Sequence, residues 1–188
     1  MSELQPLYQP DILGTGYEQA TLNFPDDYEG KVVATLIRKK AAQPTKKAVL
    51  YIHGFIDYFF QTEMAERFNQ HGFDFYALDL RKYGRSILPH QKYYNVYDLA
   101  EYDAEITQAL DIIAAEGHDA ALLCGHSTGG LTTTLYAAHH PQHSLIKALW
   151  VWFNEDSKNS CSPLLFDIAI LNDSILLYLC VKDCNKEK

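Results

Sequence analysis

The chain has 188 residues, of which 47% are apolar and 21% charged, with a formal net charge of −8 and a pI of ≈ 5.4. At roughly 150 residues per domain, this length predicts one domain with a sizeable core, and the composition excludes a wholly disordered chain. The acidic balance argues against nucleic acid or an anionic membrane as a partner, because both recruit clustered Lys and Arg.

No targeting segment is visible, because the N-terminus lacks a basic start and an apolar run. The leucine-rich stretch 163–181 is expected to be buried helix or apolar tail, since Asp167 and Asp173 oppose a membrane span. The cysteines show neither paired zinc spacing nor a dense disulfide framework, which favours the cytoplasm. They are Cys124, Cys161, Cys180 and Cys184.

The first elements predicted along the chain are a hairpin and a buried strand. Strand-like runs at residues 19–24 and 31–37 flank a turn-rich link at residues 25–30, which predicts a β-hairpin. Residues 48–52 form a short, continuous apolar run. Such runs are typical of strands buried on both faces of a parallel sheet.

Helices and strands alternate in the next part of the sequence, which predicts a parallel α/β sheet with crossover helices. Apolar residues three or four apart indicate the helices, and short apolar runs indicate the strands. The predicted elements are a helix over residues 60–68, a strand over 73–80, a helix over 99–113 with Asp98 as N-cap and Gly117 beyond its end, a strand over 120–124, a helix over 129–138 and a strand over 146–153.

The composition changes after residue 153. All ten glycines lie at or before Gly130, and three of the four cysteines lie at or after Cys161. A short helical C-terminus would account for this, but we favour a cut or shifted reading frame. We therefore divide the chain into residues 1–153, the α/β part, and residues 154–188, an aberrant or truncated tail. The strand 146–153 would then be an open sheet edge with an uncharged run at residues 148–153, which predicts oligomers or aggregation.

The strongest chemical signal is a G-x-S-x-G motif between a predicted strand and a predicted helix. Gly125 and Gly129 suit a turn too tight for side chains, which would lift Ser127 above the sheet edge as a nucleophile. The N-terminus of the following helix would offer free N–H groups and a positive dipole end to an oxyanion. A glycine-rich turn that binds phosphate, or nothing, is the alternative.

Backbone N–H groups near this serine are expected to form an oxyanion hole. One donor would be Thr128, directly after the nucleophile, and the other Phe55, in the loop after strand 48–52. The side chain of His53 is interpreted as a packed structural group. Further along, Arg85 lies in a turn interpreted as structural, where its planar guanidinium can tie loops together.

Two further patterns are interpreted as structural. His139, His140 and His143 surround a helix-breaking proline without a spaced carboxylate, which favours a solvated helix end over a metal site. A group of tyrosines is expected to pack under a long loop. These are Tyr93, Tyr94, Tyr97 and Tyr102.

With these motifs the chain resembles the N-terminal two-thirds of an α/β-hydrolase, within the serine aminopeptidase S33-like or lysophospholipase (monoglyceride-lipase-like) group. The resemblance runs from about residue 17 to about residue 153 and rests on residues 53–55, 84–86 and 125–130. It implies a mostly parallel sheet with helices on both faces, an N-terminal hairpin and missing last strands.

The resemblance also implies a function. It makes Ser127 the nucleophile and Phe55 and Thr128 the oxyanion donors, with no cofactor and no metal. The implied substrate is a small acyl ester, either lipid-like, a lysophospholipid or a monoacylglycerol. A peptidase of the same fold is a minority alternative.

The sequence departs from the family where the rest of the catalytic machinery should follow. The family order is Ser, then Asp or Glu, then His, but no histidine occurs after His143. None of the acids in the tail is assigned a role; these are Asp156, Asp167, Asp173 and Asp183. The 188-residue chain is therefore predicted to be a very poor catalyst, and a non-catalytic fragment is the main alternative. A nucleotide-binding domain is weakly supported, because no G-x-G-x-x-G follows the first parallel strand.

Overall fold

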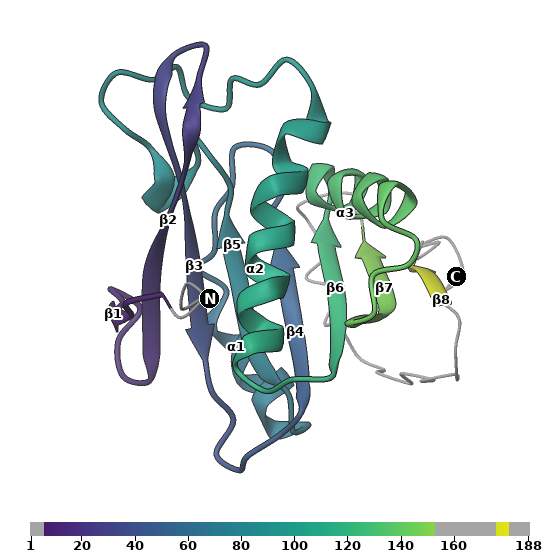
Figure 1. Ribbon diagram of the computed structural model, residues 1–188. Helices are drawn as coiled ribbons and strands as arrows, with labels where there is room; N and C mark the ends of the chain where they lie inside the picture. The colour runs from purple at the N-terminus through teal and green to yellow at the C-terminus, as the bar shows by residue number, and fades with distance from the viewer. Residues whose placement is uncertain (1–5, 153–175, 181–188) are drawn as a thin grey trace, which may run out of the picture.

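A mixed sheet of eight strands runs through the residues that the computed structural model describes, 6–152 and 176–180. In chain order the strands are β1 (Gln9–Pro10), β2 (Tyr17–Asp27), β3 (Gly30–Lys39), β4 (Lys47–Ile52), β5 (Asp74–Asp79), β6 (Ala120–His126), β7 (Ile146–Trp152) and β8 (Leu176–Cys180). They lie side by side in the order β1-β2-β3-β5-β4-β6-β7-β8 (Figure 1). Pairing is antiparallel from β1 through β3 to β5, and parallel from β5 to β8.

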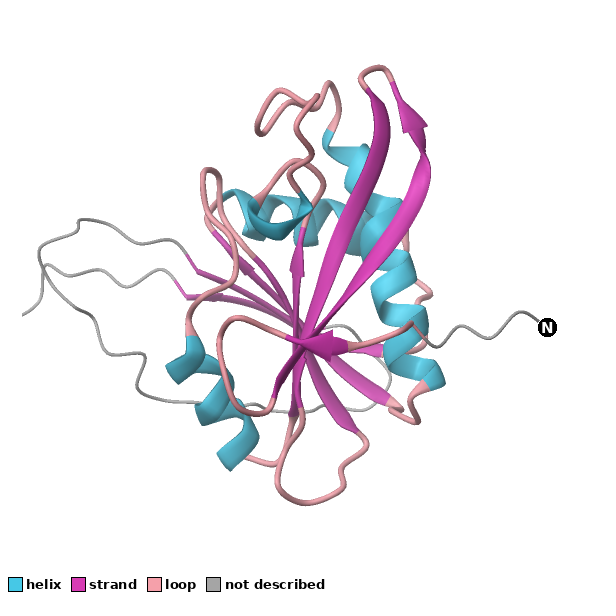
Figure 2. Cartoon of the chain, turned by 90° about the vertical axis from the view of Figure 1, so that its left-hand side faces the viewer, coloured by secondary structure: helices cyan, strands magenta, loops and turns pink. Residues whose placement is uncertain are grey.

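Helices cover both faces of this sheet, as the sequence predicts. Within the described residues they are α1 (Thr62–Gln70), α2 (Asp103–Ala115) and α3 (Thr128–His139), with 3₁₀ turns η1 (Gly84–Ser86) and η2 (Leu99–Tyr102). Side chains alternate along β4, so that Leu50 joins the core under α2 whereas Val49 and Tyr51 join Phe68 of α1. Figure 2 shows the helices on either side of the sheet.

The predicted hairpin is present and longer than expected. β2 and β3 pair as far as Asp27 and Gly30, with a register shift after Phe24. The link at residues 25–30, expected to be a turn, therefore mostly continues the strands, and only Tyr28 and Glu29 make the turn. A bulge of this kind lets a strand accommodate the proline in this segment.

The long helix begins as predicted at Asp98, but its first turn is 3₁₀. The Asp98 carboxylate accepts the Ala100 N–H at 2.9 Å, and Glu101 in return accepts the Asp98 N–H at 3.2 Å. This capping box satisfies N–H groups that a helix start leaves unpaired. Gly117 follows α2 with a φ of 99°, a conformation that favours glycine.

β8 corrects the expectation of an open sheet edge at residues 146–153. It pairs in parallel with β7, from Ala148 opposite Leu176 to Trp152 opposite Cys180. Residues 176–180, expected to be helix or irregular tail, form a strand, which is the one strand after β7 among the described residues. Phe153 and the rest of the predicted tail lie outside the described residues, and the division of the chain at residue 153 stays a prediction. Among the described helices, none has both the length and the apolar character needed to cross a membrane.

Candidate active site

Ser127 forms the entire junction between β6 and α3. Its φ of 53° and ψ of −120° lie outside the conformations common for residues with a side chain. Its N–H donates to the Trp152 carbonyl of β7 at 2.9 Å, and its carbonyl accepts the Gly130 N–H at 2.8 Å. The strained backbone is thus held from both sides, as observed at functional turns.

Glycines surround this serine because the chain segments approach too closely for side chains. A Cβ at Gly125 would overlap the Gly129 carbonyl, and one at Gly129 would overlap the carbonyls of Ile52 and His53. A Cβ at Gly130 would likewise collide with a methyl group of β7. The first turn of α3 therefore lies directly against β4 and β6.

The loop after β4 lies beside Ser127. An ideal Cβ at Gly54 would be 3.4 Å from the Ser127 Cβ. Since consecutive Cα atoms are about 3.8 Å apart, the Phe55 Cα lies within about 9 Å of that atom. In the part of the chain that the structure describes, neither the Phe55 nor the Thr128 N–H meets an acceptor. Both predicted donors are thus free and close to the serine.

His53 fixes this loop through its ring. Its Nε2 accepts the Leu80 N–H at 3.1 Å, so Nδ1 carries the proton and donates to the Gly54 carbonyl at 2.8 Å. Because the Phe55 N–H belongs to the same peptide group as that carbonyl, it points away from the histidine. Burial lowers the pKa of His53. The prediction that His53 is structural is confirmed.

Arg85 anchors the far end of the same loop. Its guanidinium binds Asp11 with two hydrogen bonds, at 2.7 and 2.9 Å, and Asp79 with one, at 2.8 Å. Asp79 also accepts the Phe59 N–H at 2.9 Å, and Arg85 donates to the Phe59 carbonyl at 3.0 Å. The predicted loop-tying role of Arg85 is confirmed. No pattern in the sequence pointed to Asp11, which lies 74 residues away.

A base for Ser127 is not apparent in the described ranges, where no histidine is hydrogen-bonded to its hydroxyl. The ring of the neighbouring His126 stacks on Trp152, and its Nδ1 lies 3.8 Å from Asp57. Burial raises the pKa of Asp57, but His126 and the Tyr58 N–H outweigh it, and the pKa lies below its ordinary value.

The histidine cluster at the end of α3 has an acidic partner that comes from a distant part of the sequence. Asp103 of α2 lies 2.7 Å from Nδ1 of His139 and 3.5 Å from Nε2 of His140. Across the described residues, no three His, Cys, Asp or Glu side chains are grouped so as to hold a metal ion.

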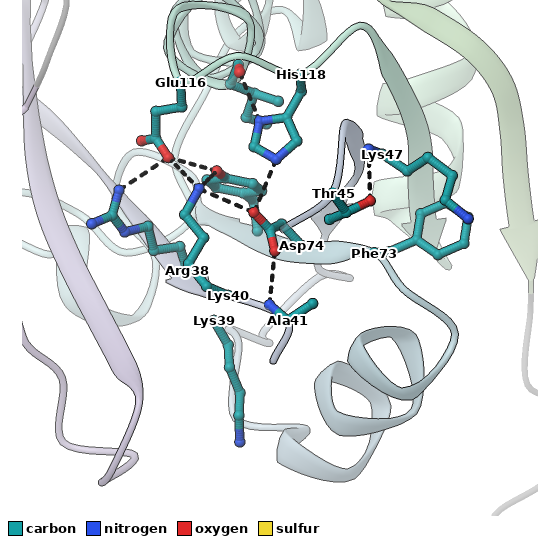
Figure 3. Close-up of polar contacts among 12 residues, drawn as sticks. Arg38, Lys39, Lys40, Ala41, Thr45, Lys47, Phe73, Asp74, Glu116 and His118 are labelled. Carbon is teal, nitrogen blue, oxygen red and sulfur yellow. Dashed lines mark hydrogen bonds and ion pairs between the residues drawn. The ribbon is translucent and has the colours of Figure 1, made fainter. Parts of the chain in front are cut away.

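A second polar cluster lies at the opposite end of the parallel strands (Figure 3). Glu116, at the end of α2, accepts hydrogen bonds from Tyr8 at 2.8 Å, Tyr76 at 2.7 Å and Lys40 at 2.6 Å. Arg38 adds an ion pair with Glu116 at 3.0 Å. Burial raises the pKa of Glu116, but these donors outweigh it, and the pKa is lowered.

Asp74 and His118, the other members of this cluster, also have protein partners. Asp74 accepts from the Ala41 N–H at 2.7 Å and contacts Nε2 of His118 at 3.0 Å, while His118 Nδ1 meets the Ile113 carbonyl at 2.9 Å (Figure 3). Lys40 joins the two halves, since it also pairs with Asp74 at 3.2 Å. Because the two carboxylates and the histidine of this cluster bind protein groups, we interpret the cluster as a structural contact between elements and not as a catalytic site.

The arrangement of sheet, helices and serine turn defines the α/β-hydrolase fold. A lipase in its open form matches with a TM-score of 0.58 at 16% identity, over 72% of this chain and 43% of that chain. A carboxyl esterase from Bacillus coagulans matches with a TM-score of 0.58 at 19% identity, over the same shares. An epoxide hydrolase from an endophytic Streptomyces gives 0.54 at 21% identity, over 74% of this chain and 38% of that chain.

Within that fold the chain belongs to the serine aminopeptidase S33 family, whose model matches residues 43–150, more than half of the chain. Epoxide hydrolase 4 of Mus musculus is 31% identical over 103 residues, and that of Homo sapiens is 30% identical over the same length. Each match covers 54% of this chain but only 27% of the relative. The chain therefore corresponds to about a quarter of the length of these relatives.

Proposed function

We propose that Ser127 is the nucleophile of a serine hydrolase acting on carboxylic esters of the lipid-like class, such as lysophospholipids or monoacylglycerols. Its hydroxyl oxygen adds to the ester carbonyl and the alcohol leaves, taking a proton, to give an acyl-Ser127 ester. Water then hydrolyses that ester and regenerates the hydroxyl. The observation that carries the proposal is the strained Ser127 backbone beside two N–H groups, of Phe55 and Thr128, that have no acceptor among the described residues.

The proposed oxyanion donors are the N–H groups of Phe55 and Thr128. Each such donor contributes on the order of 10²–10³ in turnover when aimed at the developing oxyanion. Thr128 is also the first residue of α3, whose dipole adds positive potential there. The side chains of Phe55 and Ile56 are 57% and 66% exposed, which supports an apolar acyl group as the occupant of this edge.

The nucleophile also favours esters over the epoxides that the names of two relatives suggest. A hydroxyl that opened an epoxide would leave a stable ether on the protein, whereas attack on an ester leaves an ester that water can cleave. A peptidase would use the same acyl-Ser127 intermediate with an amine as the leaving group. The esterase and the peptidase therefore differ in substrate and not in mechanism. A non-catalytic protein would leave Ser127 unreactive.

A fluorophosphonate probe tests the proposal directly, because it phosphonylates a serine whose oxygen is activated beside an oxyanion site. We expect slow labelling of the full chain at Ser127, identified by peptide mass spectrometry. The Ser127→Ala variant should lose this labelling, and Ser144→Ala, which removes an exposed serine, should keep it. Equal labelling of the wild type and Ser127→Ala would contradict the proposal and favour the non-catalytic alternative.

Three substrates then separate the activities. We expect the difference between the wild type and Ser127→Ala to be largest with a p-nitrophenyl ester of a medium-chain fatty acid. An aminoacyl p-nitroanilide as the best substrate would favour the peptidase. Ser127-dependent opening of an aryl epoxide would favour the epoxide hydrolase and contradict the ether argument.

A further inference from the structure

Lys82 is a fully buried cation whose backbone adopts a conformation that is unfavourable for residues with a side chain. It is 0% exposed, and its φ of 64° lies in the left-handed region that favours glycine. Its Nζ lies 2.7 Å from Asp27 and 2.6 Å from Glu29, at the tip of the β2–β3 hairpin, and donates to the Asn95 carbonyl at 2.9 Å. The Tyr28 ring lies over the same nitrogen at 4.3 Å. A strained, buried cation persists only where its surroundings fix it from several sides.

These partners keep Lys82 charged. Burial lowers the pKa of Lys82, but its bonds to Asp27 and Glu29 outweigh it and the pKa is raised. The same bond lowers the pKa of Glu29. The ion pairs therefore hold the hairpin tip against Lys82 at neutral pH.

Tyr94 is a second non-glycine residue in the left-handed region, with a φ of 62°. Lys82 holds it from both sides. The Tyr94 N–H donates to the Lys82 carbonyl at 3.2 Å, and the carbonyl that accepts from Lys82 Nζ belongs to Asn95, the next residue. Two strained residues, 12 positions apart in sequence, are thus tied to each other.

The Tyr94 ring reaches the proposed oxyanion loop. It meets the Phe55 ring edge-on, with 5.6 Å between the centroids, and lies 4.8 Å from the Tyr83 ring. Tyr83 in turn lies 4.6 Å from His53, which fixes the Gly54 carbonyl. Tyr94 therefore contacts the residue whose N–H is the proposed oxyanion donor.

We propose that Tyr94 is a specificity-determining wall of the acyl site and that Lys82 is the positioning residue that holds it there. The inference rests on the proposed function, because it takes Phe55 and Ser127 as parts of that site. Tyr94 bounds the space beside Phe55 and limits the length of acyl chain that fits. Lys82 acts only through Tyr94 and touches neither the substrate nor the reacting atoms.

Hydrogen exchange read by mass spectrometry tests the positioning role without any reaction at Ser127. Lys82→Met keeps an unbranched side chain that is one atom shorter and removes the charge. Lys92→Met removes an exposed charge from the loop that carries Tyr94. We expect Lys82→Met to exchange faster over residues 53–60 and 87–98, and Lys92→Met to match the wild type. Unchanged exchange in both segments of a folded Lys82→Met protein would overturn the role of Lys82.

Tyr94→Asn tests whether Tyr94 limits the length of the acyl chain. Asparagine tolerates the left-handed conformation, so this variant provides a test even if Lys82→Met fails to fold. The probes are two alkyl fluorophosphonates, one short and one long. We expect the long-to-short ratio of labelling rates to rise about tenfold, since pocket contacts of methylene size change selectivity by this order. An unchanged ratio would overturn the wall. If the wild type is not labelled at Ser127, the proposed function fails and the acyl wall with it, while the exchange result separately decides whether Lys82 positions the loops.

Discussion

At the scale of single residues, the serine turn depends on glycines with no room for a methyl group. Gly129→Ala should cost more than about 3 kcal/mol of unfolding free energy, because its Cβ would overlap two backbone carbonyls that cannot move cheaply. Gly117→Ala is the matched control, since its Cβ would meet nothing within 4 Å and only its φ of 99° is unfavourable. It should cost about 1 kcal/mol. Urea unfolding measures both values, and equal costs would contradict the close packing.

His53 should impose a pH dependence on stability. Its pKa is lowered in the folded state, so the unfolded chain takes up a proton first as the pH falls below about 6.5. The stability that His53 contributes is therefore present above this pH and lost below it, at up to about 1.4 kcal/mol per pH unit. Urea unfolding between pH 7.5 and 5.5 should show a smaller slope for His53→Asn than for the wild type.

Tyr83→Phe is the control for this slope, because it alters a ring that packs on His53 and does not titrate in this range. It should keep the slope of the wild type. A His53→Asn protein with the wild-type slope would show that His53 takes up a proton as readily in the folded as in the unfolded state, against its two backbone hydrogen bonds.

At the scale of elements, Glu116 joins α2 to β3, β5 and the N-terminal segment. Glu116→Gln should destabilise the protein by about 2–3 kcal/mol, because it leaves Arg38 and Lys40 without their shared acid. Glu18→Gln should cost no more than about 1 kcal/mol, since Glu18 also pairs with Arg38 but is 43% exposed, against 9% for Glu116. Thermal unfolding of both variants at pH 7 measures the two losses of stability. Similar losses would argue against a larger contribution from the buried Glu116.

The local sequence pattern predicted the helices and strands, but it did not predict the exact form of several segments that begin, end or connect them. The spacing of apolar residues predicted α1, α2 and α3, and Asp98 predicted the start of the long helix. The 3₁₀ turn η2 and the extended hairpin depend on contacts with distant segments, which no local pattern contains. β8 was missed because residues 176–180 belong to a longer leucine-rich stretch that was expected to be buried helix or apolar tail, and a short apolar run does not distinguish a buried strand from a buried helix.

At the scale of the whole molecule, the 188-residue chain should be a very poor catalyst. The described residues place no histidine on the Ser127 hydroxyl, His53 has both ring nitrogens engaged, and the sequence holds no histidine after His143. Loss of triad members costs on the order of 10⁴–10⁶ in turnover and leaves only binding and oxyanion stabilisation. Hydrolysis of p-nitrophenyl esters should therefore barely exceed that of Ser127→Ala. Robust turnover that disappears in Ser127→Ala would reveal an unexpected base.

The class of sheet, the alternation of helices and strands, and the serine turn could be predicted from the amino-acid sequence alone. These features are local, since a strand, two glycines and a helix start within a few residues of Ser127 are enough to specify the turn. The position of Phe55 after strand 48–52 led to its prediction as an oxyanion donor, and the family resemblance implies the same role.

The ion pairs and hydrogen bonds that join distant parts of the chain could not be predicted and are visible only in the folded structure. Arg85 meets Asp11 across 74 residues, and Tyr8 meets Glu116 across 108. Asp27, Glu29 and Asn95 surround the ammonium group of Lys82, whose backbone lies in the left-handed region. Such pairs carry no periodic signal, since a buried charge is stable wherever the folded chain brings a partner within about 4 Å of it.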